Sequence, residues 1–142
     1  MIGLDTNLLV RYIMQDDKAQ SALATTLIEN LTAQDPGFVP LVAMVELVWV
    51  LTSAYDLSPA QVNQALENLL RSKQLVVDQA ETVWKALRAV QSTGTDFADA
   101  LIAHTARAAG CTQVMTFDRA AAKRGEMTLV GHERRAYEKG EF

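Results

Sequence analysis

The chain has 142 residues, of which 49% are hydrophobic and 21% are charged, and its formal net charge is −4. This length suits one domain with a substantial core. The negative charge argues against a protein held to nucleic acid by a broad basic surface. The negative charge does not exclude nucleic-acid binding, because four of the acidic residues are candidates for a site where a bound cation would offset part of their charge.

The composition also restricts the compartment. A lone cysteine cannot form an internal disulfide, which favours a reducing environment. No signal peptide is evident, because Asp5 interrupts the opening apolar run, and no apolar stretch reaches the roughly 20 residues of a membrane helix. We therefore expect a cytoplasmic protein with a single domain over residues 1–142 and a polar tail from about residue 131.

Short apolar runs alternate with helical patterns along the chain. Ser58, Pro59 and Gln61 mark a helix start, and Gly110 marks a helix end. Residues 41–51 suit a buried strand as well as a buried helix, but the length of the stretch favours a helix. In chain order, the expected elements are a strand at 1–4, a helix from about 8 capped by Thr6 or Asn7, a helix opened by Asp17, a strand at 38–39, a helix at 41–51 extending toward 55, a helix from 59, a strand at 75–77, a helix opened by Asp78, a helix at 97–109, and strands at 114–117 and 127–130.

Strands that alternate with helices predict an α/β protein, here a three-layer α/β/α sandwich around a mainly parallel central sheet. In such folds, ligands bind beyond the carboxyl ends of the strands. Asp5 and Asp118 directly follow predicted strands. We expect both carboxylates at that edge of the sheet.

Four acidic residues lie next to or within apolar segments, where a carboxylate is unusual: Asp5, Glu46, Asp99 and Asp118. Glu46 interrupts an apolar stretch, and Asp99 lies at the start of an apolar-faced helix. If the fold gathers them, they form a cluster of like charge that needs a cation to stay ionised. Oxygen ligands of this kind suit Mg²⁺ or Mn²⁺, which indicates metal-dependent phosphate chemistry.

Each carboxylate also has a structural explanation. Asp5 can close a turn, Asp118 can be an ordinary N-cap, and Glu46 can pair with an arginine or lie on a narrow exposed stripe. We favour a functional role for Glu46, because a glutamate among apolar neighbours is rarely left unpaired in a core. Asp96 is assigned to the cap of its helix, which leaves Asp99 for chemistry.

Other conspicuous side chains are expected to be structural. Asn7 is a helix-cap candidate, and His104 is expected on the surface. Trp49 and Trp84 are expected in the core. Cys111 has no nearby histidine or basic cluster, so we expect it to be unreactive.

Four motifs follow one another along the chain: residues 4–12 around Asp5, 45–51 around Glu46, 97–103 around Asp99 and 116–119 around Asp118. Together they resemble the motifs of the PIN-domain nucleases, and within these the VapC-type toxins of bacterial toxin–antitoxin pairs. The resemblance covers nearly the whole chain and includes all four acidic positions.

The resemblance implies a central parallel sheet flanked by helices, cleavage of RNA with Mg²⁺ or Mn²⁺, and a homodimer bound by a cognate antitoxin. On the matching positions, Asp5, Asp99 and Asp118 would hold the metal directly or through water. Glu46 would position a second ion or the attacking water.

Two alternatives stay open. A phosphatase resembling the haloacid dehalogenases would place a second aspartate two residues after the first, where this chain has Asn7. A binding module without activity, either a silent PIN fold or a receiver-like domain, would cut nothing, and a receiver-like domain would also need an acidic pair near its start. Dependence of RNA cleavage on Mg²⁺ separates these classes from a nuclease.

Overall fold

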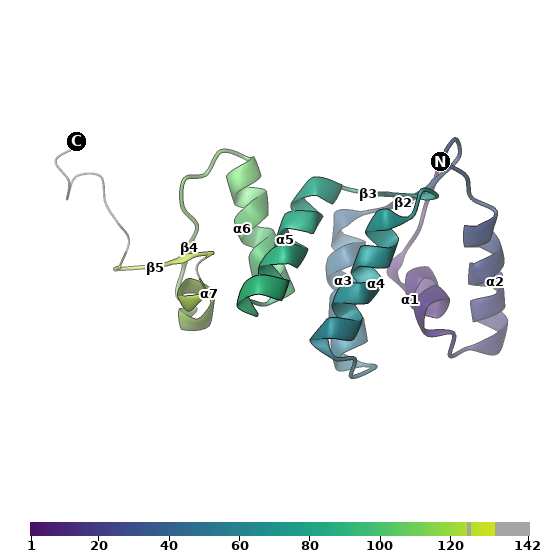
Figure 1. Cartoon of the computed structure of the whole chain (residues 1–142), viewed down its shortest axis with the longest axis horizontal. Helices are drawn as coiled ribbons and strands as arrows, with labels where there is room; N and C mark the ends of the chain where they lie inside the picture. The colour runs from purple at the N-terminus through teal and green to yellow at the C-terminus, as the bar shows by residue number, and fades with distance from the viewer. Residues whose placement is uncertain (125, 133–142) are drawn as a thin grey trace. The chain divides into compact units, whose positions relative to one another are not determined.

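The structure is a computed structural model that describes residues 1–124 and 126–132 (Figure 1). The chain divides into two compact units, which we call unit 1 (residues 1–84) and unit 2 (residues 85–142). The tail expected from about residue 131 lies outside the described residues from position 133 on. That the whole chain forms a single domain stays a prediction.

A three-stranded parallel sheet organises unit 1. Its strands are β1 (Ile2–Gly3), β2 (Gly37–Val39) and β3 (Leu75–Val77), with β2 in the middle. In the register, Phe38 of β2 is the partner of Gly3 on one side and of Val76 on the other. Two helices connect each pair of strands: α1 (Thr6–Met14) and α2 (Lys18–Glu29), then α3 (Leu41–Ser53) and α4 (Pro59–Arg71). The predicted α/β class, with a parallel sheet flanked by helices, is confirmed (Figure 1).

Local capping signals predict the starts of α2, at Asp17, and of α4, at Ser58. Ser58 and Gln61 form the expected capping box. The Gln61 N–H donates to the Ser58 hydroxyl at 3.2 Å, and the Ser58 N–H donates to the Gln61 side-chain carbonyl at 2.9 Å. The prediction is wrong for α1, because Thr6 and Asn7 lie inside the helix. Asp5 is the cap: its backbone is extended, and its Oδ1 accepts a hydrogen bond from the Leu8 N–H at 3.2 Å.

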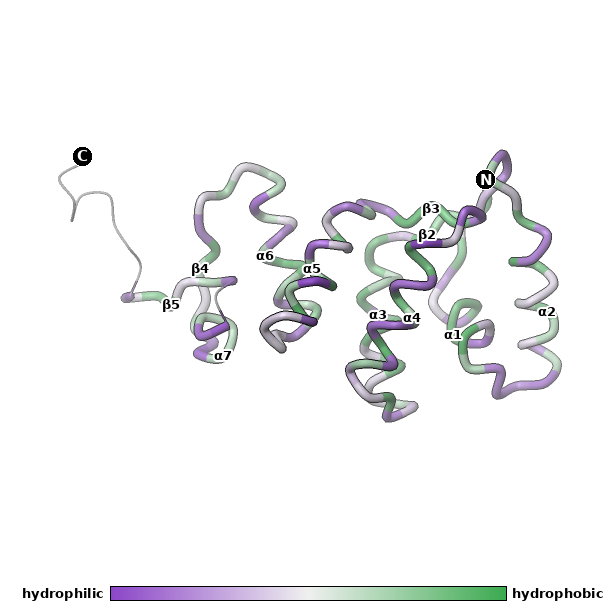
Figure 2. Tube along the Cα trace, in the orientation of Figure 1, coloured by the Kyte–Doolittle hydropathy of each residue, from purple (hydrophilic) through white to green (hydrophobic). Residues whose placement is uncertain are grey.

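Helix α3 consists mostly of apolar residues (Figure 2), and one of its sides is buried. Its buried side chains are Ala43, Met44, Leu47 and Leu51. Trp49 is 70% exposed, so its predicted place in the core is wrong. Each residue turns about 100° around a helix, and a position two residues from Leu47 therefore faces away from the core.

A polar cluster joins the loop after α1 to the end of α3. The Tyr55 hydroxyl donates to Asp16 Oδ2 at 2.6 Å, and Arg11 Nη1 donates to the Tyr55 oxygen at 3.0 Å and to Asp16 Oδ1 at 3.2 Å. The hydrogen bond from Tyr55 lowers the pKa of Asp16, and the same bond raises the pKa of Tyr55. The cluster therefore favours an ionised Asp16 beside a protonated Tyr55.

Helix α5 (Ala80–Thr93) begins in unit 1 and continues into unit 2. Unit 2 also contains α6 (Phe97–Ala108), β4 (Met115–Thr116), α7 (Arg119–Lys123) and β5 (Thr128–Leu129), and its two strands pair in parallel. Gly110, with a φ of 102°, follows the end of α6 as predicted. Within the described residues, no helix is long and apolar enough to cross a membrane.

Candidate active site

Asp5 and Glu46 belong to unit 1. Asp5 follows β1 and caps α1, while Glu46 lies in the second turn of α3. The Thr6 hydroxyl donates a hydrogen bond to Glu46 Oε1 at 2.9 Å, across 40 positions of sequence. Because Thr6 directly follows Asp5, this contact brings the two acidic residues to the same part of unit 1.

The expected burial of Glu46 is wrong. Its side chain is exposed, as are those of Val42 and Trp49 on the same helix. Its apolar neighbours Met44 and Leu47 are buried, while Glu46 lies on the narrow exposed stripe that was the alternative explanation. Its candidacy therefore rests on its contact with Thr6, a residue that sequence analysis did not single out as part of the site.

Asp99 of unit 2 faces other carboxylates. It is half-buried on the first turn of α6. Burial raises the pKa of Asp99, and the negative charges of Asp96 and Asp118 raise it further. Asp96 is the N-cap of α6, with its Oδ2 accepting from the Asp99 N–H at 3.2 Å, so the structural role predicted for Asp96 is confirmed.

Asp118 is oriented by the backbone around it. Its Oδ1 accepts hydrogen bonds from the N–H groups of Ala120 at 2.8 Å and Ala121 at 3.2 Å, which makes it the N-cap of α7. Its own N–H donates to the Thr116 hydroxyl at 2.9 Å. A carboxylate has about four lone-pair positions, so this capping role leaves acceptor capacity for a ligand.

His104 is half-buried, contrary to the expectation of a surface residue. It lies on the side of α6 that meets Glu126, with 3.4 Å between its Nε2 and the glutamate Oε2. The same carboxylate accepts a hydrogen bond from Arg107 Nη1 at 2.7 Å. His104 and Arg107 thus connect α6 to the segment before β5.

The PIN-domain family model matches residues 2–126. The chain belongs to the PIN-domain family. This match includes Asp5, Glu46, Asp99 and Asp118, and it confirms the family to which the motifs pointed. PIN domains are generally ribonucleases and typically use Mg²⁺. A comparison with curated proteins gave no match.

The carboxylates of Asp5, Glu46, Asp99 and Asp118 in this PIN domain are oxygen donors of the kind that a hard cation such as Mg²⁺ prefers. In unit 2, burial raises the pKa of Asp99 most, and the negative charges of Asp96 and Asp118 raise it further; a bound cation would offset this repulsion. Within the described part of either unit, no three His, Cys, Asp or Glu side chains are grouped closely enough to hold a metal ion. The convergence of all four carboxylates in one pocket stays a prediction.

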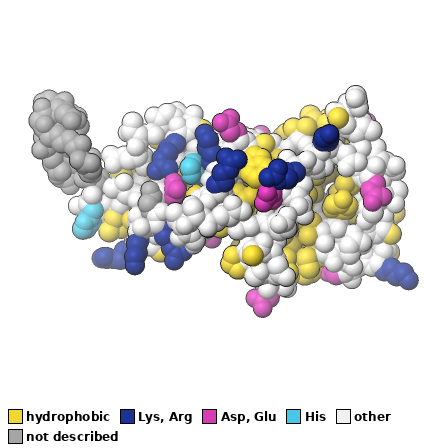
Figure 3. Space-filling model, in the orientation of Figure 1, with side chains coloured by type: hydrophobic (Ala, Val, Ile, Leu, Met, Phe, Trp, Pro, Cys, Tyr) yellow, Lys and Arg dark blue, Asp and Glu magenta, His cyan; other side chains and the backbone are white. Residues whose placement is uncertain are grey.

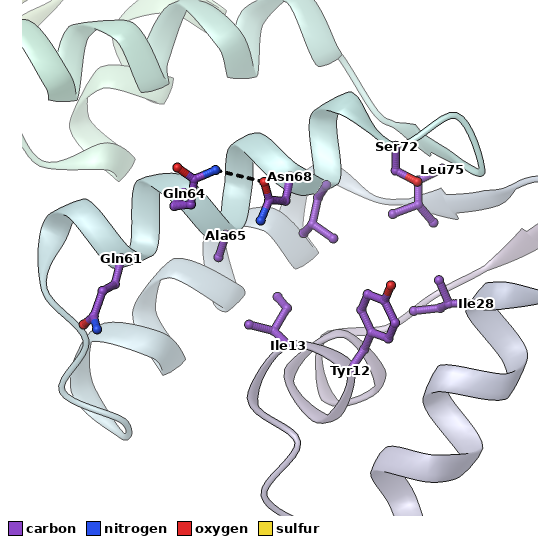
Figure 4. Close-up of a pocket in the computed structure, with 10 residues that line it drawn as sticks. Tyr12, Ile13, Ile28, Gln61, Gln64, Ala65, Asn68, Ser72 and Leu75 are labelled. Atoms are coloured by element: carbon purple, nitrogen blue, oxygen red, sulfur yellow. Dashed lines mark hydrogen bonds between the residues drawn. The ribbon is translucent and has the colours of Figure 1, made fainter.

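Unit 1 of the PIN domain also has two hollows among its helices. The larger, of about 520 Å³, lies between α4 and the α1–α2 pair, and Figure 4 shows Tyr12 and Ile13 across from the amides of Gln64 and Asn68. The smaller hollow, of about 230 Å³, lies between α1 and α2. Its lining is Asn7, Leu8, Arg11, Gln20, Leu23, Ala24 and Leu27.

Proposed function

We propose that this PIN domain is an Mg²⁺- or Mn²⁺-dependent endoribonuclease with Asp5, Glu46, Asp99 and Asp118 as its catalytic residues. The observation that carries the proposal is the half-buried Asp99, whose charge is opposed by Asp96 and Asp118. A protein keeps such an arrangement at a cost in stability, and perturbed acids of this kind concentrate at functional sites. Membership of a nuclease family supplies the reaction class.

In this mechanism, Asp5, Asp99 and Asp118 would hold the cation directly or through water. A bound divalent cation lowers the pKa of water and neutralises charge that develops on the phosphate. Glu46, whose Oε1 accepts a hydrogen bond from the Thr6 hydroxyl at 2.9 Å, would position the attacking water or a second ion. The oxygen of the water would form a bond to phosphorus while the bond from phosphorus to the leaving ribose oxygen breaks. The water would lose a proton to solvent, and the leaving oxygen would take one up from solvent to become a hydroxyl group.

The purified chain is expected to cleave single-stranded RNA in millimolar Mg²⁺ and to lose this activity in EDTA. Mg²⁺ should also raise the melting temperature, because the folded chain binds the ion in preference to the unfolded chain. The Asp5→Asn variant should show a smaller shift, since it lacks one ligand. Gel analysis of labelled RNA and thermal melts measure both effects.

Two controls separate the alternatives. A haloacid-dehalogenase-like phosphatase would hydrolyse p-nitrophenyl phosphate and leave RNA intact. A binding module would retain RNA or another ligand without cutting it. Identical melting curves in Mg²⁺ and in EDTA, together with intact RNA, would contradict the nuclease assignment.

We further propose that the protein is the toxin of a toxin–antitoxin pair and acts as a homodimer bound by a protein partner. The hollow between α1 and α2 is the observation that favours binding of a helical segment of the partner. Leu23 and Leu27, which are one helical turn apart on α2, both line this hollow, and Leu23 is 72% exposed. Such a surface suits apolar anchors of a second helix. A basic side chain from the partner could pair with the acidic residues and silence the enzyme.

Expression of the chain alone is expected to arrest bacterial growth, and co-expression with the product of the adjacent small gene should restore it. Leu23→Asp should weaken the partner complex and relieve inhibition, because it places a charge against the apolar anchors of the partner. Growth curves, co-purification and light scattering test the effect and the dimer. A harmless monomer that no neighbouring gene product binds would contradict the toxin role.

A further inference from the structure

Phe117 exposes an unusually large apolar surface beside an acidic candidate. Its side chain is 83% exposed, the highest value among the large apolar side chains of the described residues. It immediately precedes Asp118 in the bend between β4 and α7. A single exposed apolar residue is common on protein surfaces, so exposure alone carries no function. Two further features favour a function for this ring: the ordered backbone on both sides of Phe117 and the basic residues of the helix that follows it.

The backbone on both sides of Phe117 is held by hydrogen bonds. Thr116 pairs with β5 through the Val130 N–H, at 2.9 Å to the Thr116 carbonyl oxygen. On the other side, Asp118 bonds to the Thr116 hydroxyl and caps α7. The ring is therefore carried by a short ordered bend between two regular elements. A phenylalanine with two side-chain torsions loses little conformational freedom when a ligand covers it.

The charge of the chain is unevenly divided between its two units. Figure 3 shows one face, with several Lys and Arg side chains on the described part of unit 2. Of its 13 Lys and Arg residues, nine lie in residues 85–142 together with seven of the 17 Asp and Glu residues, a net charge of +2. Residues 1–84 hold the other four basic and ten acidic residues, a net charge of −6. Arg119 and Lys123 on α7 are both exposed. The segment that carries Phe117 thus combines an aromatic face with cations that suit phosphate groups.

We propose that Phe117 is a substrate-binding residue on which one base of a single-stranded RNA stacks, with Arg119 and Lys123 contacting the adjoining phosphates. This inference rests on the proposed ribonuclease function and adds the residue that places a nucleotide next to Asp118. Every base has a π face, so a lone phenyl ring binds single strands with little sequence preference and excludes paired bases, whose faces are already stacked.

The test compares Phe117→Leu, which keeps an apolar side chain but removes the ring, with Phe117→Tyr, which keeps the ring. Affinity for a fluorescein-labelled, mixed-sequence RNA decamer is measured by anisotropy in Mg²⁺, with Asp99→Asn present in every variant to prevent cleavage. Phe117→Leu is expected to weaken binding by roughly 5- to 100-fold, and Phe117→Tyr to change it little. Melting temperatures of both variants should match that of the parent, because the ring is exposed.

Single abasic positions along the decamer identify the stacked base. One abasic site should weaken binding to the parent by about the same factor as Phe117→Leu, and it should have little further effect on that variant, because the two changes remove one contact. In cleavage assays with Asp99 intact, Phe117→Leu should raise KM more than it lowers kcat.

Several results would overturn the inference. If the parent cleaves RNA and Phe117→Leu binds and cleaves equally well, the stacking role is wrong while the ribonuclease function stands. If Phe117→Leu lowers the melting temperature or disrupts only the protein partner complex, the ring has a structural or protein-binding role. If the parent with Asp99 intact cleaves no RNA, the ribonuclease proposal fails, and the stacking inference falls with it.

Discussion

Replacing Asp99 with asparagine is expected to reduce RNA cleavage by more than about 100-fold. The amide has the same shape but carries no charge, so it is a poor ligand for Mg²⁺. Loss of a residue that only orients a metal ligand typically lowers metal affinity or activity by about 10- to 100-fold. Loss of a proposed ligand itself should lower activity further. Initial rates of RNA cleavage at saturating Mg²⁺ measure the effect.

The same substitution is expected to stabilise the metal-free fold at neutral pH. Burial, then Asp96 and Asp118, raise the pKa of Asp99 above its ordinary value of 3.8. A folded state with a raised acid pKa binds the proton more tightly than the unfolded state, so stability is lost as the pH rises from the unfolded pKa through the folded pKa. Asp99→Asn removes this penalty. Its melting temperature in EDTA should exceed that of the parent at pH 7, and the difference should vanish below about pH 3.8.

Asp96 supplies the matched control, because it carries the same charge three residues earlier and caps α6. Asp96→Asn should retain both cleavage and the cap, since asparagine is an equally good N-cap. Asp96→Ala should lower the free energy of unfolding by about 1 kcal/mol while cleavage continues. Loss of cleavage in Asp96→Asn with full activity in Asp99→Asn would mean that the other aspartate binds the metal.

Replacing Leu47 with alanine is expected to lower the free energy of unfolding by roughly 2–5 kcal/mol. Leu47 is fully buried on α3, and its truncation leaves a cavity in the core of unit 1. Trp49→Ala removes a larger side chain from the same helix, yet it should change the free energy of unfolding by only about 0.5 kcal/mol, because that side chain is exposed.

Urea unfolding followed by circular dichroism compares the two variants at several protein concentrations. The concentration series matters because a dimer contact at Trp49 would make its effect depend on protein concentration. A larger loss for Trp49→Ala than for Leu47→Ala at every concentration would contradict the orientation of α3.

Local sequence signals predict the secondary structure well where the signal and the element lie together. The capping box of Ser58 and Gln61 and the helix end before Gly110 depend on residues within one turn. The cap of α1 shows the limit, because Asp5, Thr6 and Asn7 can all accept the required hydrogen bond. The extended backbone of Asp5 decides among them.

The orientation of α3 was not predictable from its sequence. Nearly all of its residues are apolar, so the pattern has no polar face that distinguishes inside from outside. Contacts with α1 and α4 determine which side is buried. For the same reason, the expectations that Trp49 lies in the core and that Glu46 is buried were both wrong, while Leu47 between them is fully buried.

The sequence by itself determined the α/β class, the order of the elements and the family, because strand and helix periodicity and the acidic motifs are local patterns. Only the tertiary structure decided that the Thr6 hydroxyl bonds to Glu46 and that the charges of Asp96 and Asp118 act on Asp99. Asp99 and Asp118 lie 19 positions apart in the chain, and Thr6 and Glu46 lie 40 apart. Packing between elements sets such distances, and no local propensity encodes them.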